Sequence, residues 1–251
     1  MLRLSLLSSA TLSLASACIL AATPVRAQFG GPQAQPTTQV HDATALKPPA
    51  GSRVAIVEFE DMECPSCAMA NPILVKAAAQ YKIPWIRHDF PLPQHSWSMQ
   101  AAINARWFDA KDTKIEKFGD EYRDYIFLSH NAIATAQDLR AYTETFAKAH
   151  KLGQLPFAVD PQGAFAAQIA ADKALGQKIG IDHTPTIWIV TSQSRGAPFI
   201  EVRNPESQLY QTIDLAIADT KPAIQPQKTP KTPQKTVKQP QKPATQPSPA
   251  Q

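Results

Sequence analysis

The apolar positions of the chain alternate between strand-like and helix-like spacing. Residues 54–59 (VAIVEF) form a short, β-branched apolar run, which is typical of a buried central strand. Residues 68–80 are rich in alanine and contain no glycine, and this predicts a helix. Residues 83–90 (IPWIRHDF) predict a second strand, which a proline-rich stretch then ends. The first part of the pattern is therefore strand, helix, strand.

The helix predicted over residues 68–80 has a recognisable apolar face. Met69, Ile73 and Ala77 are spaced on one side, which we expect to be the buried side. Pro72 lies inside the helix and is expected to bend it, because proline cannot donate a backbone hydrogen bond.

A helical pattern extends over about residues 96–179. It contains four candidate helices, near residues 97–110, 114–129, 136–150 and 161–178. Thr135 and Asp138 form a near capping box at the start of the third helix. Asp160 lies directly before Pro161, and this pair predicts a capping acid and a proline at the first position of the fourth helix.

Two strand-like runs and a final helix close the pattern. Residues 186–190 (TIWIV) and 198–202 (PFIEV) are joined through a turn candidate at residues 194–196, so we expect them to pair as a hairpin. Asn204-Pro205 then begins a helix. Its apolar face is formed by Leu209, Ile213 and Ile217. Strands and helices in this order indicate an α/β fold.

The first 27 residues have the features of a secretory signal peptide. Arg3 precedes an apolar, serine-interrupted run that stays uncharged until Arg26, and we expect cleavage after Ala27. A membrane anchor is one alternative, although the many Ser and Thr residues make the run weakly hydrophobic. A lipoprotein attached through Cys18 is another, although apolar residues continue past that cysteine. The predicted location is therefore periplasmic or secreted.

Two polar segments flank the predicted folded domain of residues 51–218. Residues 28–50 are rich in Gln, Pro and Thr and are expected to be flexible. Residues 219–251 are expected to form a disordered tail, because from residue 221 onward they hold six Lys and eight Pro but no acidic or aromatic residue. Such a tail serves as a solvated spacer or contacts anionic envelope surfaces.

The formal net charge of +4 is a property of this tail. Without residues 221–251 and the signal peptide, the chain holds 17 basic and 21 acidic residues. The basic residues of the tail lack interleaved aromatic residues and lie outside the folded body of a protein expected to be exported. Nucleic acid is therefore excluded as a partner class.

The CPSC motif of residues 64–67 is the cysteine pair that remains once cleavage has removed Cys18. At a helix start, free backbone N–H groups and the helix dipole stabilise a thiolate. Cys64 is therefore predicted to be the attacking sulfur, with a pKa in the range of roughly 3.5 to 7.5. Cys67, one turn further into the helix, is predicted to be the resolving thiol. Such a pair moves two electrons without a cofactor.

Other uses of the pair are an inert dithiol or a metal site. The mature chain has no second cysteine pair to complete a four-cysteine cage. Met62 with the two cysteines also fits the Met-x-Cys-x-x-Cys pattern of small copper or soft-metal domains. Such domains need neither a long helical insertion nor a downstream Thr-Pro loop, so no metal site is assigned.

Three features occur together and in a characteristic order. They are residues 54–67 (VAIVEFEDMECPSC), the long helical stretch, and residues 180–186 (GIDHTPT). In this combination the chain resembles the DsbA-like branch of the thioredoxin superfamily over about residues 50–218. The resemblance implies a thioredoxin fold with an inserted α-helical domain at about residues 96–179.

The resemblance also implies roles for residues outside the CPSC motif. Pro185 would be a cis-proline facing the cysteines, and the backbone of Thr184 would pair with the substrate chain as an added strand. Glu58, six residues before Cys64, matches a buried acid that relays a proton to the resolving cysteine; an ordinary strand-end carboxylate is the alternative. His183 stands where many relatives have glycine, and it either tunes the cysteines or is an ordinary loop histidine.

The motif departs from the family pattern in one respect. Pro65 is followed by the neutral Ser66, where DsbA-type oxidants often hold a histidine. Three acidic residues also lie close by in sequence: Glu60, Asp61 and Glu63. Acidic neighbours disfavour a thiolate, so we predict a weaker oxidant than DsbA.

The sequence thus predicts an extracytoplasmic dithiol-disulfide oxidoreductase that oxidises thiols of exported proteins and needs no cofactor. Its expected partners are thiol-containing exported proteins and a membrane or soluble redox partner, and it is expected to be a monomer. A disulfide isomerase or reductase is an alternative, but these commonly carry a dimerisation domain that residues 28–50 are too short to supply. An envelope metal carrier is the other alternative. His95 and the four tryptophans are expected to pack rather than to act in the site.

Overall fold

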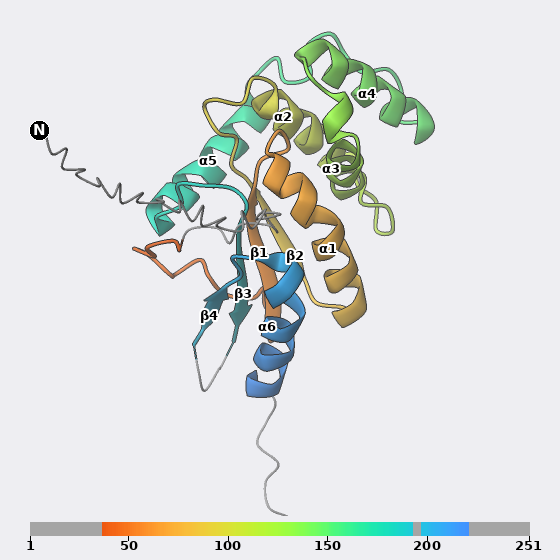
Figure 1. Cartoon of the computed structure of the whole chain (residues 1–251). Helices are drawn as coiled ribbons and strands as arrows, with labels where there is room; N and C mark the ends of the chain where they lie inside the picture. The colour runs from red at the N-terminus through yellow and green to blue at the C-terminus, as the bar shows by residue number, and fades with distance from the viewer. Residues whose placement is uncertain (1–36, 193–196, 221–251) are drawn as a thin grey trace, which may run out of the picture.

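The computed structural model describes residues 37–192 and 197–220 (Figure 1). The predicted signal peptide, including Cys18, and the tail beyond residue 220 lie outside these ranges. The predicted turn at residues 194–196 does so too. None of the helices in the described ranges has the length and hydropathy of a membrane span.

A four-stranded mixed sheet in the order β2-β1-β3-β4 forms the centre of the molecule. β1 (Val54–Glu60) pairs in parallel with β2 (Trp85–Asp89) and antiparallel with β3 (Thr186–Thr191). β4 (Phe199–Glu201) completes a hairpin with β3. Parallel neighbours need a crossover connection, and α1 (Pro65–Tyr81) supplies it between β1 and β2. The predicted strand-helix-strand unit and the predicted hairpin are confirmed.

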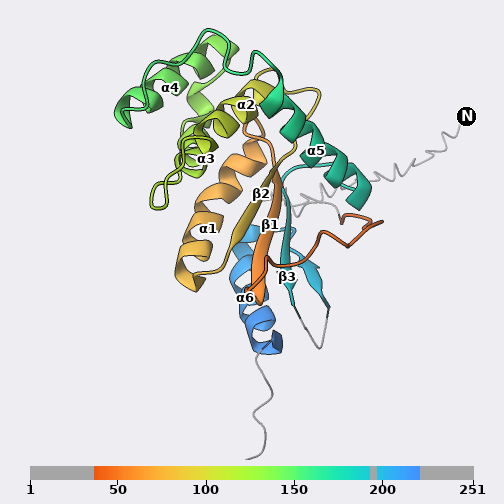
Figure 2. The same cartoon turned by 180° about the vertical axis from the view of Figure 1, so that it is seen from behind.

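Helices cover both faces of this sheet (Figures 1 and 2). Ile56 packs with α1 and α6 (Pro205–Thr220) on one face. Its neighbour Val57 packs with Trp188 and with α5 (Ala164–Ile179) on the other. Every residue of β1 is buried, since both of its faces are covered. This explains why the strand reads as a continuous apolar run rather than an alternating one.

The helical stretch is inserted between β2 and β3. It consists of α2 (Ser98–Asp109), α3 (Phe118–Leu128), a 3₁₀ helix (His130–Ala132), α4 (Ala136–Ala149) and α5. Its helices build a core of their own, which includes Trp97, Phe108, Tyr122, Ile126, Leu139 and Phe146. The predicted α/β class with a helical insertion is therefore confirmed.

The apolar face predicted for α1 is confirmed at Ala77 and wrong at Met69. Ala77 is buried and Ile73 packs against the core, but Met69 is 61% exposed, and Ala70 and Leu74 are buried instead. The helix contacts both α6 and α3, so its buried stripe is turned away from Met69. The helix begins at Pro65, directly after the cysteine predicted to lie at its start, and it continues through Pro72.

The predicted starts of two insertion helices have different outcomes. The capping box of α4 is confirmed, because the side chain of Thr135 accepts a hydrogen bond from the Asp138 amide and the Asp138 carboxylate accepts one from the Thr135 amide. The predicted start of α5 at Pro161 is wrong. That helix begins at Ala164 after Gly163, whose φ of +73° favours glycine. Asp160 still caps it from a distance, since its Oδ2 accepts the Ala166 amide at 2.8 Å.

The expectation that residues 28–50 are flexible is wrong for residues 37–50. The amide and hydroxyl of Thr38 donate hydrogen bonds to the Glu201 carboxylate, and Lys178 forms an ion pair with Asp42 at 2.7 Å. Leu46 is 3% exposed and joins the core beneath α5. Composition failed here because a few anchoring contacts hold an otherwise polar segment.

Buried charges join the sheet to the insertion. Arg87 lies 2.9 Å from a Glu60 carboxylate oxygen, and Arg123 lies 3.3 Å from oxygens of both Glu60 and Asp89. Arg123 also lies 3.1 Å from Asp109. Removing one partner from a buried ion pair is costly, because the other charge is left without compensation. The network therefore fixes how α3 sits against β1 and β2.

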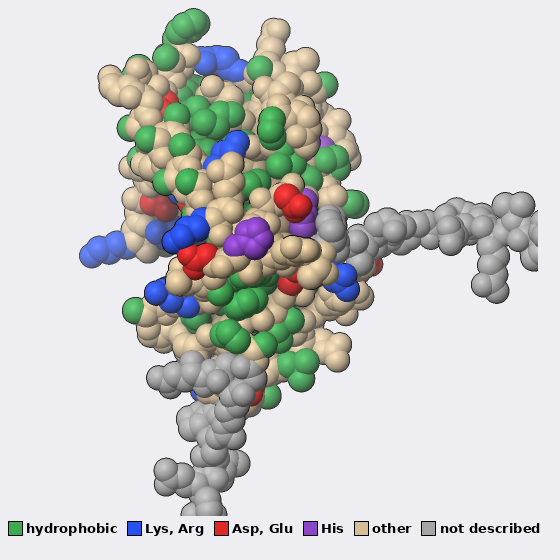
Figure 3. Space-filling model, turned by 90° about the vertical axis from the view of Figure 1, so that its left-hand side faces the viewer, with side chains coloured by type: hydrophobic (Ala, Val, Ile, Leu, Met, Phe, Trp, Pro, Cys, Tyr) green, Lys and Arg blue, Asp and Glu red, His purple; other side chains and the backbone are tan. Residues whose placement is uncertain are grey.

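The molecular face shown in Figure 3 has a mixed surface. Acidic and basic side chains are interspersed there with apolar and neutral ones, and neither sign of charge dominates the face.

Arg123→Met is expected to lower the free energy of unfolding by about 3 to 5 kcal/mol, because Glu60 and Asp89 lose a buried partner. Urea denaturation measures the change. Lys117→Met is the control, since Lys117 is exposed and pairs with Asp112 at 3.3 Å. It should cost less than about 1 kcal/mol. Equal losses for the two variants would contradict the role assigned to Arg123.

Candidate active site

Cys64 lies at the N-cap position of α1, with Pro65 as the first helical residue. Its side chain is 7% exposed. Hydrogen bonding from the Cys67 thiol, aided by the backbone amides of Cys67 and Ser66, lowers the pKa of Cys64 to about 6, against the opposing effect of burial. This value falls in the range predicted from the motif. At neutral pH the sulfur is therefore mostly thiolate.

Cys67 has the opposite environment. It is completely buried and packs in the core of the insertion. Burial raises its pKa well above the ordinary value, and hydrogen bonding to Cys64 raises it further. The backbone amide of Asp61 lies 3.5 Å from its sulfur and acts in the other direction. The thiol of Cys64 thus loses its proton readily, while that of Cys67 retains it.

The loop before β3 lies against Cys64. The Cys64 sulfur is 3.4 Å from the carbonyl oxygen of Thr184, which is 120 residues away in the chain. The peptide bond between Thr184 and Pro185 is cis. Pairing of β1 with β3, in a register that sets Phe59 opposite Thr186, brings the two loops together. The structure therefore places the two motifs singled out in the sequence side by side.

Glu58 is a buried carboxyl group in the middle of the sheet. It is 1% exposed and accepts a hydrogen bond from the Trp85 indole at 3.0 Å. Burial, together with the charge of Glu60, raises the pKa of Glu58 well above its usual range. Its charge in turn is one of the influences that raise the pKa of Cys67. Glu58 thus has the burial and the raised pKa expected of a relay residue, while its role in proton transfer to Cys67 stays a prediction.

His183 is placed in the same loop as Thr184. Its Nδ1 lies 2.7 Å from an Asp182 carboxylate oxygen, and its ring is mostly buried. The hydrogen bond of the ring is thus made to its neighbour in sequence, Asp182.

The three acidic residues near the motif in sequence are each engaged elsewhere. Glu60 binds Arg87, and Asp61 accepts the Leu92 amide at 2.7 Å. The carboxylate of Glu63 accepts the backbone amides of Trp97 and Ser98 at the start of α2, at 2.6 and 2.9 Å. Other donors thus compensate the charges of these acids, which limits the effect that acidic neighbours have on the Cys64 thiolate. That the protein is a weaker oxidant than DsbA stays a prediction.

Sequence reasoning missed the role of Asp61, Glu63 and two histidines. His95, expected to be a packing residue, lies with Nδ1 2.6 Å from the Asp61 carboxylate. His130 donates from Nε2 to the carbonyl oxygen of Glu63 at 2.9 Å. The available signal was two acidic residues in a loop just before a helix-capping cysteine, since carboxylates commonly cap backbone amides.

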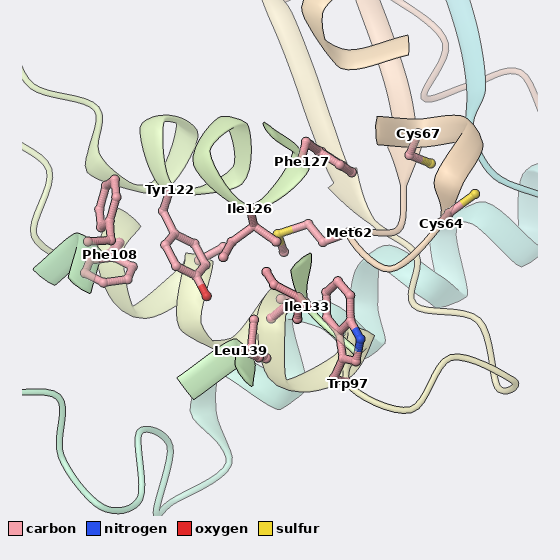
Figure 4. Packing of buried hydrophobic residues seen from close by; sticks show 14 of the residues in the cluster. Met62, Cys64, Cys67, Trp97, Phe108, Tyr122, Ile126, Phe127, Ile133 and Leu139 are labelled. Atoms are coloured by element: carbon pink, nitrogen blue, oxygen red, sulfur yellow. The ribbon is translucent and has the colours of Figure 1, made fainter. Parts of the chain in front are cut away.

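Met62 does not join the cysteines in a common site. It is 2% exposed, and its side chain extends toward Ile126 in the core of the insertion, away from Cys64 and Cys67 (Figure 4). Within residues 37–192 and 197–220, no cluster of three or more His, Cys, Asp or Glu side chains has the arrangement of a metal site. The Met-x-Cys-x-x-Cys reading therefore gains no support from the geometry.

Comparisons with known proteins agree with this arrangement. A family model described as Thioredoxin (Thioredoxin_4) matches residues 50–199. No curated protein sequence matches the chain.

Solved structures give the fold. Alpha-DsbA1 of Wolbachia pipientis is 17% identical, with a TM-score of 0.54 and coverage of 73% of this chain and 96% of that one. The thiol-disulfide exchange protein alpha-DsbA2 of the same organism is 17% identical, with a TM-score of 0.51 and coverage of 67% and 85%. Oxidised BdbD of Bacillus subtilis is 18% identical, with a TM-score of 0.55 and coverage of 73% and 99%.

The ultraviolet absorbance of the thiolate should titrate with a midpoint near pH 6 in the reduced protein, in accord with the Cys64 pKa of about 6. Cys67→Ala should raise that midpoint, because the thiol that donates to Cys64 is lost. Cys67→Ser is the matched control, since its hydroxyl still donates. A midpoint that is the same in Cys67→Ala as in the unchanged protein would show that Cys67 does not stabilise the thiolate.

Proposed function

Because the chain belongs to the thioredoxin family and shares the fold of its DsbA-like members, we propose that it is an extracytoplasmic dithiol-disulfide oxidoreductase that oxidises the thiols of exported proteins. One observation carries the proposal: Cys64 caps α1, has a pKa of about 6, and lies 3.4 Å from the carbonyl oxygen of Thr184. That alpha-DsbA2 is a thiol-disulfide exchange protein supports the same reaction class.

The reaction would proceed through a mixed disulfide. A client thiolate attacks the sulfur of Cys64 in the Cys64–Cys67 disulfide, that bond breaks, and the electron pair goes to Cys67, which takes up a proton. A second client thiolate then attacks the client sulfur of the mixed disulfide, so a client disulfide forms and Cys64 leaves as a thiolate. The client loses two electrons and the protein gains them. In the proposal, Glu58 relays the proton of Cys67.

The cis-proline loop would hold the client. A client segment that adds as a strand along Thr184 and Pro185 would bring its thiol to the sulfur of Cys64, because Thr184 already touches that sulfur. Pro65 is exposed beside the pair, and the backbone amide of Ser66 favours the Cys64 thiolate. His183, two residues before Pro185, would lie at the edge of the same client site.

The cellular setting of this proposal comes from the sequence. A signal peptide cleaved after Ala27 would deliver the protein to the periplasm or the medium, where disulfides persist. A membrane or soluble redox partner would then reoxidise the cysteines, and the protein would act as a monomer without a cofactor. Isomerase or reductase action uses the same pair and differs in its redox potential.

Cys67→Ser should accumulate mixed disulfides between Cys64 and client proteins, because the resolving thiol is missing while the attacking one remains. Non-reducing electrophoresis and mass spectrometry of the protein incubated with oxidised client peptides measure the adducts. Cys64→Ser is the matched control and should form none. Absence of adducts with Cys67→Ser, together with stoichiometric copper binding by the unchanged protein, would favour a metal carrier instead.

The reduction potential should lie between about −270 mV, as in thioredoxin, and about −120 mV, as in DsbA. The reason is that a Cys64 pKa of about 6 lies between the values of about 7 and about 3.5 for the corresponding cysteines of those two proteins. Equilibration with glutathione buffers of known composition measures it. A potential at the thioredoxin end would contradict the oxidising direction.

A further inference from the structure

The carboxylate of Asp61 is a buried acceptor that holds together two loops. Its side chain has no exposed area. One oxygen accepts the backbone amide of Glu63 at 2.8 Å, and the other accepts the amide of Leu92 at 2.7 Å and Nδ1 of His95 at 2.6 Å. A carboxylate only accepts hydrogen bonds when ionised, so the His95 Nδ1 is the donor. Three donors therefore compensate one buried charge.

The backbone of the same residue contacts the resolving cysteine. The Asp61 amide donates to the Cys67 sulfur at 3.5 Å, and this hydrogen bond acts against the burial that keeps Cys67 protonated. Hydrogen bonds to the charged form of a group favour that form. The amide and the carboxylate belong to the same residue, so contacts that hold the carboxylate also restrict the position of the amide. The contacts of that side chain with Leu92 and His95 thus bear directly on the Cys67 thiolate.

His95 lies in the connection between β2 and α2, which follows the cysteines in the chain. Its side chain is 17% exposed, so it reaches the buried carboxylate from the surface. The adjoining residues of this connection bind Glu63, through the amides of Trp97 and Ser98. The loop that precedes Cys64 is therefore fastened to the insertion by two carboxylates, of which only Asp61 also contacts Cys67.

We propose that Asp61 and His95 form a positioning pair that stabilises the Cys67 thiolate during disulfide exchange, an inference that rests on the proposed function of the cysteines. His95 holds the Asp61 carboxylate, and the Asp61 amide is thereby held against the Cys67 sulfur. Neither residue touches the client. Their effect falls on the step in which Cys67 carries negative charge and not on the attack by Cys64.

The step affected is the same in both directions of the exchange. When a mixed disulfide is resolved, the Cys67 thiolate attacks the Cys64 sulfur, the bond from Cys64 to the external sulfur breaks, and that sulfur leaves with the electron pair and takes up a proton. In the reverse direction the Cys64–Cys67 bond breaks and Cys67 leaves as the thiolate. A better-stabilised leaving thiolate departs faster.

The titratable groups that face Cys67 come from the elements around it. They are Cys64 on the same helix, Glu58 on β1, and the pair of Asp61 and His95. Because Cys64 and Glu58 are unchanged in variants of the pair, a change in the resolving step can be assigned to the pair itself.

The experiment follows the lifetime of the Cys64–glutathione adduct after the reduced protein is mixed with oxidised glutathione, with acid quenching and mass spectrometry. His95→Ala should lengthen that lifetime about tenfold, because the buried carboxylate loses one of its three donors and the Asp61 amide is held less firmly against the Cys67 sulfur. His95→Asn should restore the short lifetime, since its side-chain nitrogen replaces Nδ1. Asp61→Asn should resemble His95→Ala.

Two further measurements separate positioning from a general structural effect. The alkylation rate of Cys64 should stay within about twofold in every variant, because the pair acts through Cys67. His88→Ala is the matched control: Nδ1 of His88 lies 2.8 Å from Asp172 in a similarly half-buried pair that does not contact the cysteines. It should leave the adduct lifetime unchanged.

The possible contrary outcomes are distinct. Equal adduct lifetimes in His95→Ala and the unchanged protein would overturn the positioning role alone, as would an equal lengthening in His88→Ala. If Asp61→Asn fails to fold, the adduct lifetimes of His95→Ala and His95→Asn are compared. A longer lifetime in His95→Ala supports the positioning role, and equal lifetimes overturn it. If the unchanged protein forms no adduct and no internal disulfide, the proposed function itself fails.

Discussion

The antiparallel pairing of β1 with β3 is the constraint on which the rest of the site depends. β1 ends just before Cys64 and β3 begins just after Pro185, so their register sets the separation of the two loops. A slip of one residue would turn every side chain of β3 to the opposite face of the sheet. Since both faces are buried, such a slip would also break both core layers. The packing of the hydrophobic core thus fixes the position of Thr184 against Cys64.

Differences in burial give two chemically identical cysteine side chains different pKa values. Cys64, at the free end of the helix, has donors around its sulfur and a lowered pKa, while Cys67, one turn further in, is enclosed and has a raised one. The position of each cysteine along the helix is enough to predict the direction of this difference in pKa. Its size depends on neighbours such as Glu58 and the Asp61 amide, which belong to other elements. The acids close in sequence to Cys64 are poor guides, because what matters is which donors compensate them.

What the sequence predicts well here is local, and what it misses depends on long-range contacts. The buried run of β1, the capping box of α4 and the cysteine at the start of α1 follow from neighbouring residues, and the structure has all three. The buried face of α1 could not be read from spacing alone, since Met69 and Leu74 are both apolar and only the positions of α3 and α6 choose between them. Residues 37–50 look like a linker by composition because their anchors, such as Glu201, lie far along the chain.

The helical insertion forms part of the surroundings of the two cysteines. Met62, Cys64 and Cys67 belong to the core of the insertion, whereas β1, from which their loop emerges, belongs to the core of the sheet (Figure 4). The loop thus crosses the boundary between two cores, and it is fastened on the insertion side by Glu63 and Asp61. A shift of the insertion relative to the sheet would move the donors of Cys67 while leaving the backbone amides that stabilise Cys64 within their own helix. The two thiols would respond differently to such a shift. In the proposed reaction, the packing of the insertion would therefore set the balance between attack by Cys64 and resolution by Cys67.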